Sequence, residues 1–271
     1  MTTAVHPSTR LAIYGAAGRM GLQILQAAAQ RTDCFVAAAL VRAESAQNGA
    51  PPALVGPTLE HNLPFRSDLP LDLVVDAIVD FSSSEGLDAA LEIALSRKIA
   101  LVSGSTGIDL AQQARLRDAS KYIPVLWSAN FSLGVALLKQ LVALAAARLG
   151  PEFDAEVFEV HHRYKKDAPS GTALALGDAI AKARGSELSD LARYSRAGND
   201  AARKAGEIGF AVSRAADIVG EHTVLFASEG ERIELTHRAG SRAIFASGAV
   251  RSAIWLARQP AGLYEVADVL L

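Results

Sequence analysis

Short apolar runs alternate with helical patterns in the first half of the chain. Buried strands are predicted at residues 11–14, 35–41, 73–81, 100–103 and 124–127. Between them, residues 22–28 and 86–95 place apolar side chains at helical spacing. This alternation is typical of a parallel sheet that helices cover on both faces. The pattern therefore predicts a doubly wound α/β fold, with an irregular, exposed segment over residues 42–70.

The pattern changes after about residue 130. A predicted helix over residues 133–149 leads into residues 153–160, where apolar and polar positions alternate as in a half-buried strand. Further strands are expected at residues 209–215, 222–227 and 232–237, with a hairpin turn at residues 228–231. We expect an α+β domain with an open mixed, mostly antiparallel sheet over residues 131–240. A helix over residues 244–256 should return to the first domain, which then comprises residues 1–130 and 241–271.

Composition and charge exclude several classes of protein. Half of the 271 residues are hydrophobic and the formal net charge is −2. Basic residues cluster only at residues 163–166, which argues against a nucleic-acid partner. A single cysteine, Cys34, allows no intramolecular disulfide and fits a reducing compartment. The N-terminus lacks the features of a secretion signal and no apolar run could span a bilayer, so we expect a cytoplasmic protein without a membrane partner.

A glycine-rich turn directly follows the first predicted strand and leads into a helical pattern. Gly15 permits a tight turn, Gly18 lets the backbone approach a pyrophosphate, and Gly21 lets the helix lie close to the sheet. The spacing Gly-x-x-Gly-x-x-Gly is a variant of the commoner dinucleotide pattern. Such a turn can also serve chain reversal alone, but its position favours a Rossmann-like nucleotide site. We expect the dinucleotide to contact Gly15, Ala16, Ala17, Gly18, Arg19 and Met20.

Val41 and Arg42 bear on which nucleotide is bound. An NAD-selective site usually has an acidic residue about 20 residues beyond the glycines, where it binds the ribose 2′-hydroxyl. Here Val41 occupies that region and Arg42 follows it. A cation without the carboxylate favours the 2′-phosphate of NADP. We therefore predict that NADPH is preferred over NADH; the alternative is that Arg42 is a solvated cation at the end of a strand.

Proton carriers, cations and a predicted helix start share residues 161–172. His161 is the candidate general acid, because imidazole exchanges protons near neutral pH. Lys165 can donate a proton or stabilise developing negative charge. His162 should face a substrate carboxylate, since neighbours in an extended segment point in different directions. Pro169 and the next two residues suit the first turn of a helix, so a carboxylate should bind the amides of Ser170, Gly171 and Thr172.

Together these motifs resemble the 4-hydroxy-tetrahydrodipicolinate reductase (dihydrodipicolinate reductase) family. The run His-His-x-x-Lys-x-Asp-Ala-Pro-Ser-Gly-Thr-Ala at residues 161–173 matches the family signature position for position. Further matches lie at residues 15–21, 80–82, 104–107, 130–134, 220–223 and 241–242. The resemblance implies NAD(P)H-dependent reduction of a cyclic dicarboxylate to tetrahydrodipicolinate, on the route to diaminopimelate and lysine. It also implies a homotetramer assembled through the domain of residues 131–240.

The resemblance implies ligand contacts outside these two runs as well. The substrate would meet Thr106 and Arg242, although Arg242 could also brace the domain junction. The cofactor would lie along Phe81, Gly104, Ser105, Thr106, Ser128, Ala129, Asn130 and Phe131. The family loop usually reads Gly-Thr-Thr-Gly; Ser105 keeps the hydroxyl, so we expect little effect. Tyr164 replaces a histidine that some members have, and its role is open.

Several alternatives compete with this interpretation. His161, His162 and Asp167 could bind a metal, but adjacent histidines seldom reach one ion, so we expect none. The chain could be another two-domain NAD(P)-dependent reductase acting on an amino or hydroxy acid, or a redox sensor that holds NADPH without turnover. We expect Glu159 and Asp167 to form structural ion pairs. Histidines 222 and 237 should be structural strand residues.

Overall fold

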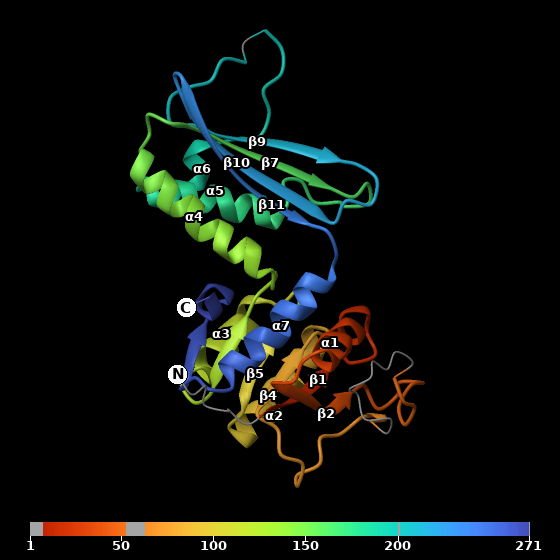
Figure 1. The fold of residues 1–271 in the computed structure, drawn as a ribbon. Coiled ribbons are helices and arrows are strands. Elements are labelled where there is room, and N and C mark those ends of the chain that lie inside the picture. Colours follow the sequence, from red (N-terminus) through yellow and green to blue (C-terminus); the bar gives the residue numbers. More distant parts are fainter. Residues whose placement is uncertain (1–7, 53–62, 200, 271) are drawn as a thin grey trace. The chain divides into compact units, whose positions relative to one another are not determined.

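The computed structural model describes residues 8–52, 63–199 and 201–270. It divides into two compact units, Met1–Ser132 with Ala243–Leu271, and Leu133–Arg242 (Figure 1). Residues 53–62 of the segment predicted to be irregular, and the N-terminal residues 1–7, lie outside the description. Within the described chain, no helix combines the length and apolar character that a membrane crossing requires.

The first unit contains a parallel sheet in the order β12-β6-β5-β4-β1-β2-β3. Its strands are β1 (Thr9–Tyr14), β2 (Cys34–Leu40), β3 (Phe65–Arg66), β4 (Ala77–Asp80), β5 (Ala100–Ser103), β6 (Pro124–Trp127) and β12 (Gly262–Tyr264). The predicted strands are confirmed, although the run at residues 73–81 gives only the short β4. Strand pairing begins after Asp76, whose carboxylate accepts hydrogen bonds from the Arg10 amide and guanidinium. Strand β3 lies in the segment predicted to be irregular, so that prediction was wrong there.

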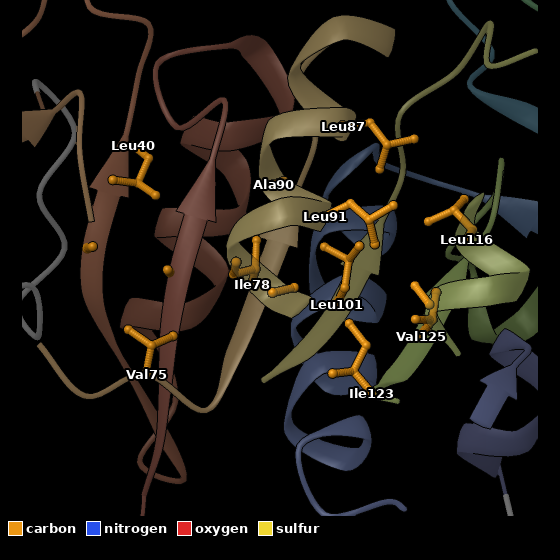
Figure 2. Close-up of a cluster of buried hydrophobic side chains, with 14 residues drawn as sticks. Leu40, Val75, Ile78, Leu87, Ala90, Leu91, Leu101, Leu116, Ile123 and Val125 are labelled. Atoms are coloured by element: carbon orange, nitrogen blue, oxygen red, sulfur yellow. The ribbon is translucent and has the colours of Figure 1, made fainter. Parts of the chain in front are cut away.

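Helices cover both faces of this sheet, as predicted. Helices α1 (Arg19–Ala29) and α7 (Ala243–Leu256) pack together on one face, while α2 (Ser84–Arg97) and α3 (Leu110–Ala119) cover the other. The short helix η1 (Val266–Leu270) packs on α7. Figure 2 shows the apolar side chains of α2 and α3 that lie against the sheet: Leu87, Leu91 and Leu116 against Ile78, Leu101 and Val125. Burial of each of these large apolar side chains stabilises the fold by roughly 1.5–3 kcal/mol. Helix α3 was not predicted, because it buries only two residues and its pattern is otherwise polar.

The second unit packs two helices on one face of a five-stranded sheet in the order β11-β10-β7-β9-β8. The helices are α4 (Leu133–Leu149) and α5 (Gly171–Ala183), with a short α6 (Leu188–Leu191). The strands are β7 (Asp154–His161), β8 (Ala192–Arg193), β9 (Ile208–Arg214), β10 (Gly220–Ser228) and β11 (Glu231–Ala239). Strand β10 is antiparallel to β7 and β11, and these ladders join more residue pairs than the parallel ladders of β9. The sheet is therefore mixed and mostly antiparallel, as predicted.

Strand β7 carries the core into the candidate site. Its buried positions alternate, and Ala155 and Val157 lie in the apolar core beneath α4 and α5. The same face continues with Glu159 and His161, which are also buried. The strand thus changes from apolar to polar on its inward face at its carboxyl end.

Candidate active site

In the first unit, the turn after β1 has the geometry that a dinucleotide site requires. Gly15 has φ +76°, a conformation that favours glycine. A Cβ at Gly21 would lie 2.2 Å from the Gly15 carbonyl oxygen, so only glycine lets α1 begin this close to the turn. Gly18 is the N-cap of α1 and provides no side-chain hydrogen bond. The first turn of α1 therefore has no side-chain cap, and its amides can donate to an anion.

A buried carboxylate connects the loops at the ends of β4 and β5. Asp80 Oδ1 accepts hydrogen bonds from the amide and hydroxyl of Ser82. Asp80 Oδ2 accepts from the Ser103 hydroxyl at 2.7 Å and the Ser105 hydroxyl at 2.8 Å. The hydroxyl that Ser105 shares with the family's usual threonine thus serves the loop itself. Sequence reasoning matched Asp80 only as part of a motif and missed this role.

Most of the residues predicted to line the cofactor gather along the same edge of the sheet. The rings of Phe81 and Phe131 lie 5.4 Å apart between centroids, and a Cβ at Gly104 would lie 2.3 Å from Phe81 Cε1. The Ser128 hydroxyl donates to the Asn130 carbonyl at 2.8 Å and shapes the loop after β6. The exposed residues of the predicted set are Gly18, Arg19, Arg42, Thr106 and Ala129.

Arg42 lies just beyond β2, with 84% of its side chain exposed. Its nearest ion-pair partner is Glu44, at 4.0 Å between Nη1 and Oε1. An exposed pair at this distance contributes little, so the guanidinium can turn to a phosphate. The sequence prediction did not weigh Glu44, which would repel that phosphate if it stayed near.

In the second unit, Glu159 joins the proton carrier to the start of a helix. The Glu159 side chain is 1% exposed, and its Oε2 forms a hydrogen bond with His161 Nδ1. Its other oxygen, Oε1, accepts from the Ser170 amide at 2.9 Å and from Arg214 Nη2 at 3.2 Å. The expected structural ion pair of Glu159 is therefore confirmed, and Arg214 is a site residue that sequence reasoning missed.

Burial and nearby charges determine the protonation states of Glu159 and His161. Burial alone would raise the pKa of Glu159, but the Ser170 amide and Arg214 hold that pKa below its usual value. Burial lowers the pKa of His161, and Glu159 opposes that shift. At neutral pH Glu159 is therefore an anion, and a neutral His161 must donate its Nδ1 hydrogen to it.

His222 lies beside His161 on the neighbouring strand β10. The two rings are edge to face, with centroids 5.0 Å apart. His222 Nε2 lies 3.2 Å from the Ser170 hydroxyl, and burial followed by the proximity of His161 lowers the pKa of His222 to about 4. Nδ1 of His222 is buried without a hydrogen-bond partner in the described part of the chain, so the expected structural role stays a prediction. Gly220, on the same strand, leaves room for the catalytic candidate, because a Cβ there would lie 2.9 Å from His161 Nε2.

Arg214 also shapes the loop between β7 and α5. Its Nη2 donates to the Asp167 carbonyl at 2.6 Å and its Nε to the Lys165 carbonyl at 3.4 Å. Lys165 Nζ donates to the Asp167 carboxylate at 2.9 Å, and this contact lowers the pKa of Asp167. The expected ion pairing of Asp167 is thus confirmed. Lys165 remains close enough to His161 to affect its charge.

Two residues predicted to bind substrate carboxylates are in contact. Arg242 Nη2 lies 3.2 Å from His162 Nε2. Arg242 is exposed and His162 half-buried, so an anion can reach both. The pair places a guanidinium and an imidazole where both could contact one carboxylate.

The start of helix α5 differs in one respect from the prediction. Ser170 is the N-cap, its hydroxyl accepts from the Ala173 amide at 3.1 Å, and α5 begins at Gly171. The Ser170 amide does bind a carboxylate, but that of Glu159, so the expectation that it binds substrate was wrong. Gly171 and Thr172 stay predicted substrate contacts.

Among the described residues, one group could in principle ligate a metal: Glu159, His161 and His222, with ligand atoms within 4.8 Å of one another. This is not the set of His161, His162 and Asp167 weighed from the sequence. The Glu159 oxygens already accept three hydrogen bonds, and Arg214 adds a positive charge that opposes a cation. The observed contacts favour proton chemistry at this cluster.

Known proteins of one family match nearly the whole chain. The family profile described as dihydrodipicolinate reductase, N-terminus, matches residues 9–131, and the one described as dihydrodipicolinate reductase, C-terminus, matches residues 134–270. A 4-hydroxy-tetrahydrodipicolinate reductase of Pseudomonas fluorescens (strain SBW25) is 46% identical over 268 residues, covering 96% of this chain and 98% of the relative. The protein of the same name from Pseudoalteromonas translucida (strain TAC 125) is 42% identical over 261 residues, covering 96% and 97%.

A solved structure has a similar fold. The dipicolinate-bound dihydrodipicolinate reductase from Paenisporosarcina sp. TG-14 matches with a TM-score of 0.77, covering 97% of this chain and 100% of that chain at 22% identity. At this identity the likeness supports the fold, an N-terminal Rossmann-like domain followed by a domain with a mixed sheet.

Proposed function

Because the chain belongs to the dihydrodipicolinate reductase family, we propose that His161 supplies the proton in the reaction of that family. The chain is an NAD(P)H-dependent oxidoreductase that reduces 4-hydroxy-tetrahydrodipicolinate to tetrahydrodipicolinate in lysine and diaminopimelate biosynthesis. When bound, the reduced nicotinamide supplies the hydride. Negative charge then develops toward the ring nitrogen of the substrate, and a proton must neutralise it.

One observation carries the assignment of the proton donor: the buried hydrogen bond between His161 Nδ1 and the Glu159 carboxylate. It fixes the imidazole and leaves Nε2 as the atom that exchanges a proton with the substrate. Lys165 supports the step as a nearby positive charge that stabilises the anion formed during hydride transfer. Its contact with Asp167 holds the ammonium group in the loop beside His161.

Most of the groups proposed to hold the dicarboxylate substrate belong to the second unit, like His161. We assign one carboxylate to His162 and Arg242, which are already in contact, and the other to the amides of Gly171 and Thr172 at the start of α5. Thr106, exposed in the loop after β5, is a further proposed contact. Ser170 keeps a supporting role through its N-cap hydrogen bond.

For the cofactor, we propose the turn at residues 15–20 as the pyrophosphate site and Arg42 as the 2′-phosphate ligand. The positive φ of Gly15 and the uncapped start of α1 fit a bound pyrophosphate. The loops that carry Phe81, Gly104–Thr106 and Ser128–Phe131 would contact the nicotinamide half. The exposed Arg42 supports a preference for NADPH over NADH.

We also propose a homotetramer formed through the sheet of the second unit. The sheet face away from α4 and α5 carries Phe158, which is 40% exposed, with the half-buried Val160 and Leu225. Apolar side chains on an uncovered sheet face support self-association. Cytoplasmic location and the absence of a nucleic-acid partner remain predictions from composition.

The decisive experiment is a coupled assay of the purified protein. Pyruvate and aspartate semialdehyde are condensed enzymatically, and oxidation of NADPH and of NADH is followed in parallel at equal concentrations. We expect substrate-dependent oxidation with a higher kcat/KM for NADPH. Equal or better efficiency with NADH would overturn the cofactor assignment, and no oxidation with either nucleotide would overturn the reductase assignment.

A further inference from the structure

We propose that Glu159 is a positioning residue that fixes the tautomer of His161 and ties His161 to the start of helix α5. The inference rests on the proposed role of His161 as proton donor. It adds a residue outside the match to the family signature run at residues 161–173. Its evidence is the set of contacts that converge on one buried carboxylate.

Three elements meet at Glu159. Its Oε2 binds His161 Nδ1, two residues further along β7. Its Oε1 accepts from the Ser170 amide, at the N-cap of α5, and from Arg214, at the end of β9. The carboxylate therefore sets the distance between the proposed donor and the proposed carboxylate site at Gly171. A displacement of Glu159 would move both parts of the substrate site.

The same contact decides which imidazole nitrogen can act. A carboxylate anion only accepts hydrogen bonds, so a neutral His161 must carry its hydrogen on Nδ1. Protonation then occurs at Nε2, and transfer of that proton to the substrate returns the ring to the Nδ1–H form. In the structure Nε2 lies next to Gly220, where no side chain intervenes.

The charged and titratable groups that face His161 come from four parts of the second unit. Glu159 is on its own strand, Arg214 is on β9, Lys165 is in the loop before α5, and His222 is on β10. Arg214 and Lys165 disfavour the imidazolium, whereas Glu159 favours it. Loss of the negative charge at position 159 would leave His161 facing two cations with no opposing anion.

The test compares Glu159→Gln with Glu156→Gln. Glu156 is on the same strand, faces the opposite side of the sheet, and also pairs with arginines, Arg196 and Arg203, so it controls for loss of a partly buried ion pair on this strand. In Glu159→Gln we expect kcat to fall by roughly 10- to 100-fold. The high-pH fall of kcat/KM should move to lower pH by about one unit. NADPH affinity, measured by fluorescence titration, should stay within about twofold, and Glu156→Gln should keep the wild-type pH profile.

Arg214→Gln should shift the pH profile in the opposite direction. Removing this cation should move the high-pH fall to higher pH, even though the loop contacts of Arg214 are also lost. Nitrogen-15 spectra of labelled histidine, with His161 assigned by its loss in His161→Gln, should show the Nδ1–H tautomer in the wild type. If Glu159→Gln does not fold, Glu159→Asp keeps the charge and should retain the wild-type pH profile at reduced kcat.

The outcomes separate this inference from the assignment on which it rests. If His161→Gln keeps a near-normal rate, the donor role itself fails. If His161→Gln is inactive but Glu159→Gln keeps both the wild-type kcat and its pH profile, the donor stands and the positioning role of Glu159 is overturned. An Nε2–H tautomer in the wild type would also overturn it.

Discussion

The hydroxyl oxygen of Ser170 lies 3.2 Å from Nε2 of His222, and this contact joins the N-cap of helix α5 to strand β10. The same oxygen accepts a hydrogen bond from the Ala173 amide, and the Ser170 amide donates to Glu159. The amide and the hydroxyl of Ser170 therefore both bind other parts of the protein. Ser170 acts by placing the first turn of α5.

Ser170→Ala should destabilise the second unit. Loss of the N-cap costs about 1 kcal/mol, and the buried His222 Nε2 loses its partner at a cost of about 1–3 kcal/mol. We expect a lower urea midpoint for this unit by far-UV circular dichroism. Ser83→Ala, which removes the cap of α2 alone, is the matched control and should cost less. Equal losses in the two variants would contradict the added role of His222.

His161→Gln should lower kcat by roughly 10²–10⁴-fold and leave NADPH affinity nearly unchanged. In the wild type, the protonated imidazole is the active form, so the rate should fall as the pH rises through the pKa of His161. Burial lowers this pKa, so kcat/KM should begin to fall below the pH typical of free imidazole. The bound dianion favours the imidazolium, so kcat should fall at a higher pH than kcat/KM. Profiles that coincide would count against this assignment.

His222 should make the stability of the protein depend on pH in a defined window. Its pKa is about 4 in the folded state and near 6.5 for the unperturbed group. Between these values the unfolded chain binds more protons, so stability is complete above about pH 6.5 and falls as the pH drops toward 4, by about 3 kcal/mol. His222→Gln should flatten this part of the curve, measured by urea unfolding at several pH values. Parallel curves for both proteins would disprove the contribution.

Arg42→Ala tests the cofactor preference. A charge-assisted hydrogen bond to the 2′-phosphate contributes about 1.5–3 kcal/mol, so kcat/KM for NADPH should fall by roughly 10- to 100-fold while that for NADH stays nearly constant. Glu44→Gln is the informative partner, because removal of its negative charge should improve NADPH use slightly. Equal losses with both nucleotides would show that Arg42 does not read the phosphate.

The sequence predicted most of the framework because its signals are local. The alternation along residues 153–160 identified β7, and the residues at 169–171 identified the start of α5 to within two positions. The glycine turn at residues 15–21 is likewise a local pattern. Each of these features depends on neighbours within a few residues, which a single sequence displays.

The missing parts depend on pairing between distant strands. Arg214 reaches Glu159 because β9 pairs parallel to β7 with Arg214 directly opposite His161, a register that the sequence of either strand does not specify. The Ser170 amide was assigned to the substrate because its acceptor, Glu159, lies 11 residues earlier in the chain, on the inward face of β7. Helix α3 was not predicted because only Leu116 and Ala119 are buried, which leaves too few apolar positions to show a helical pattern.

Asp80 has a consequence for how the nucleotide domain can change by recombination. One carboxylate, at the end of β4, accepts hydrogen bonds from Ser82 in the loop that follows β4, from Ser103 at the end of β5 and from Ser105 in the loop that follows β5, so both loops depend on the same group. A graft of either loop from another Rossmann-like domain would leave Asp80 short of donors or the serines short of an acceptor. The two loops are therefore exchangeable only as a pair, and β4 with β5 forms the smallest transplantable module of this edge.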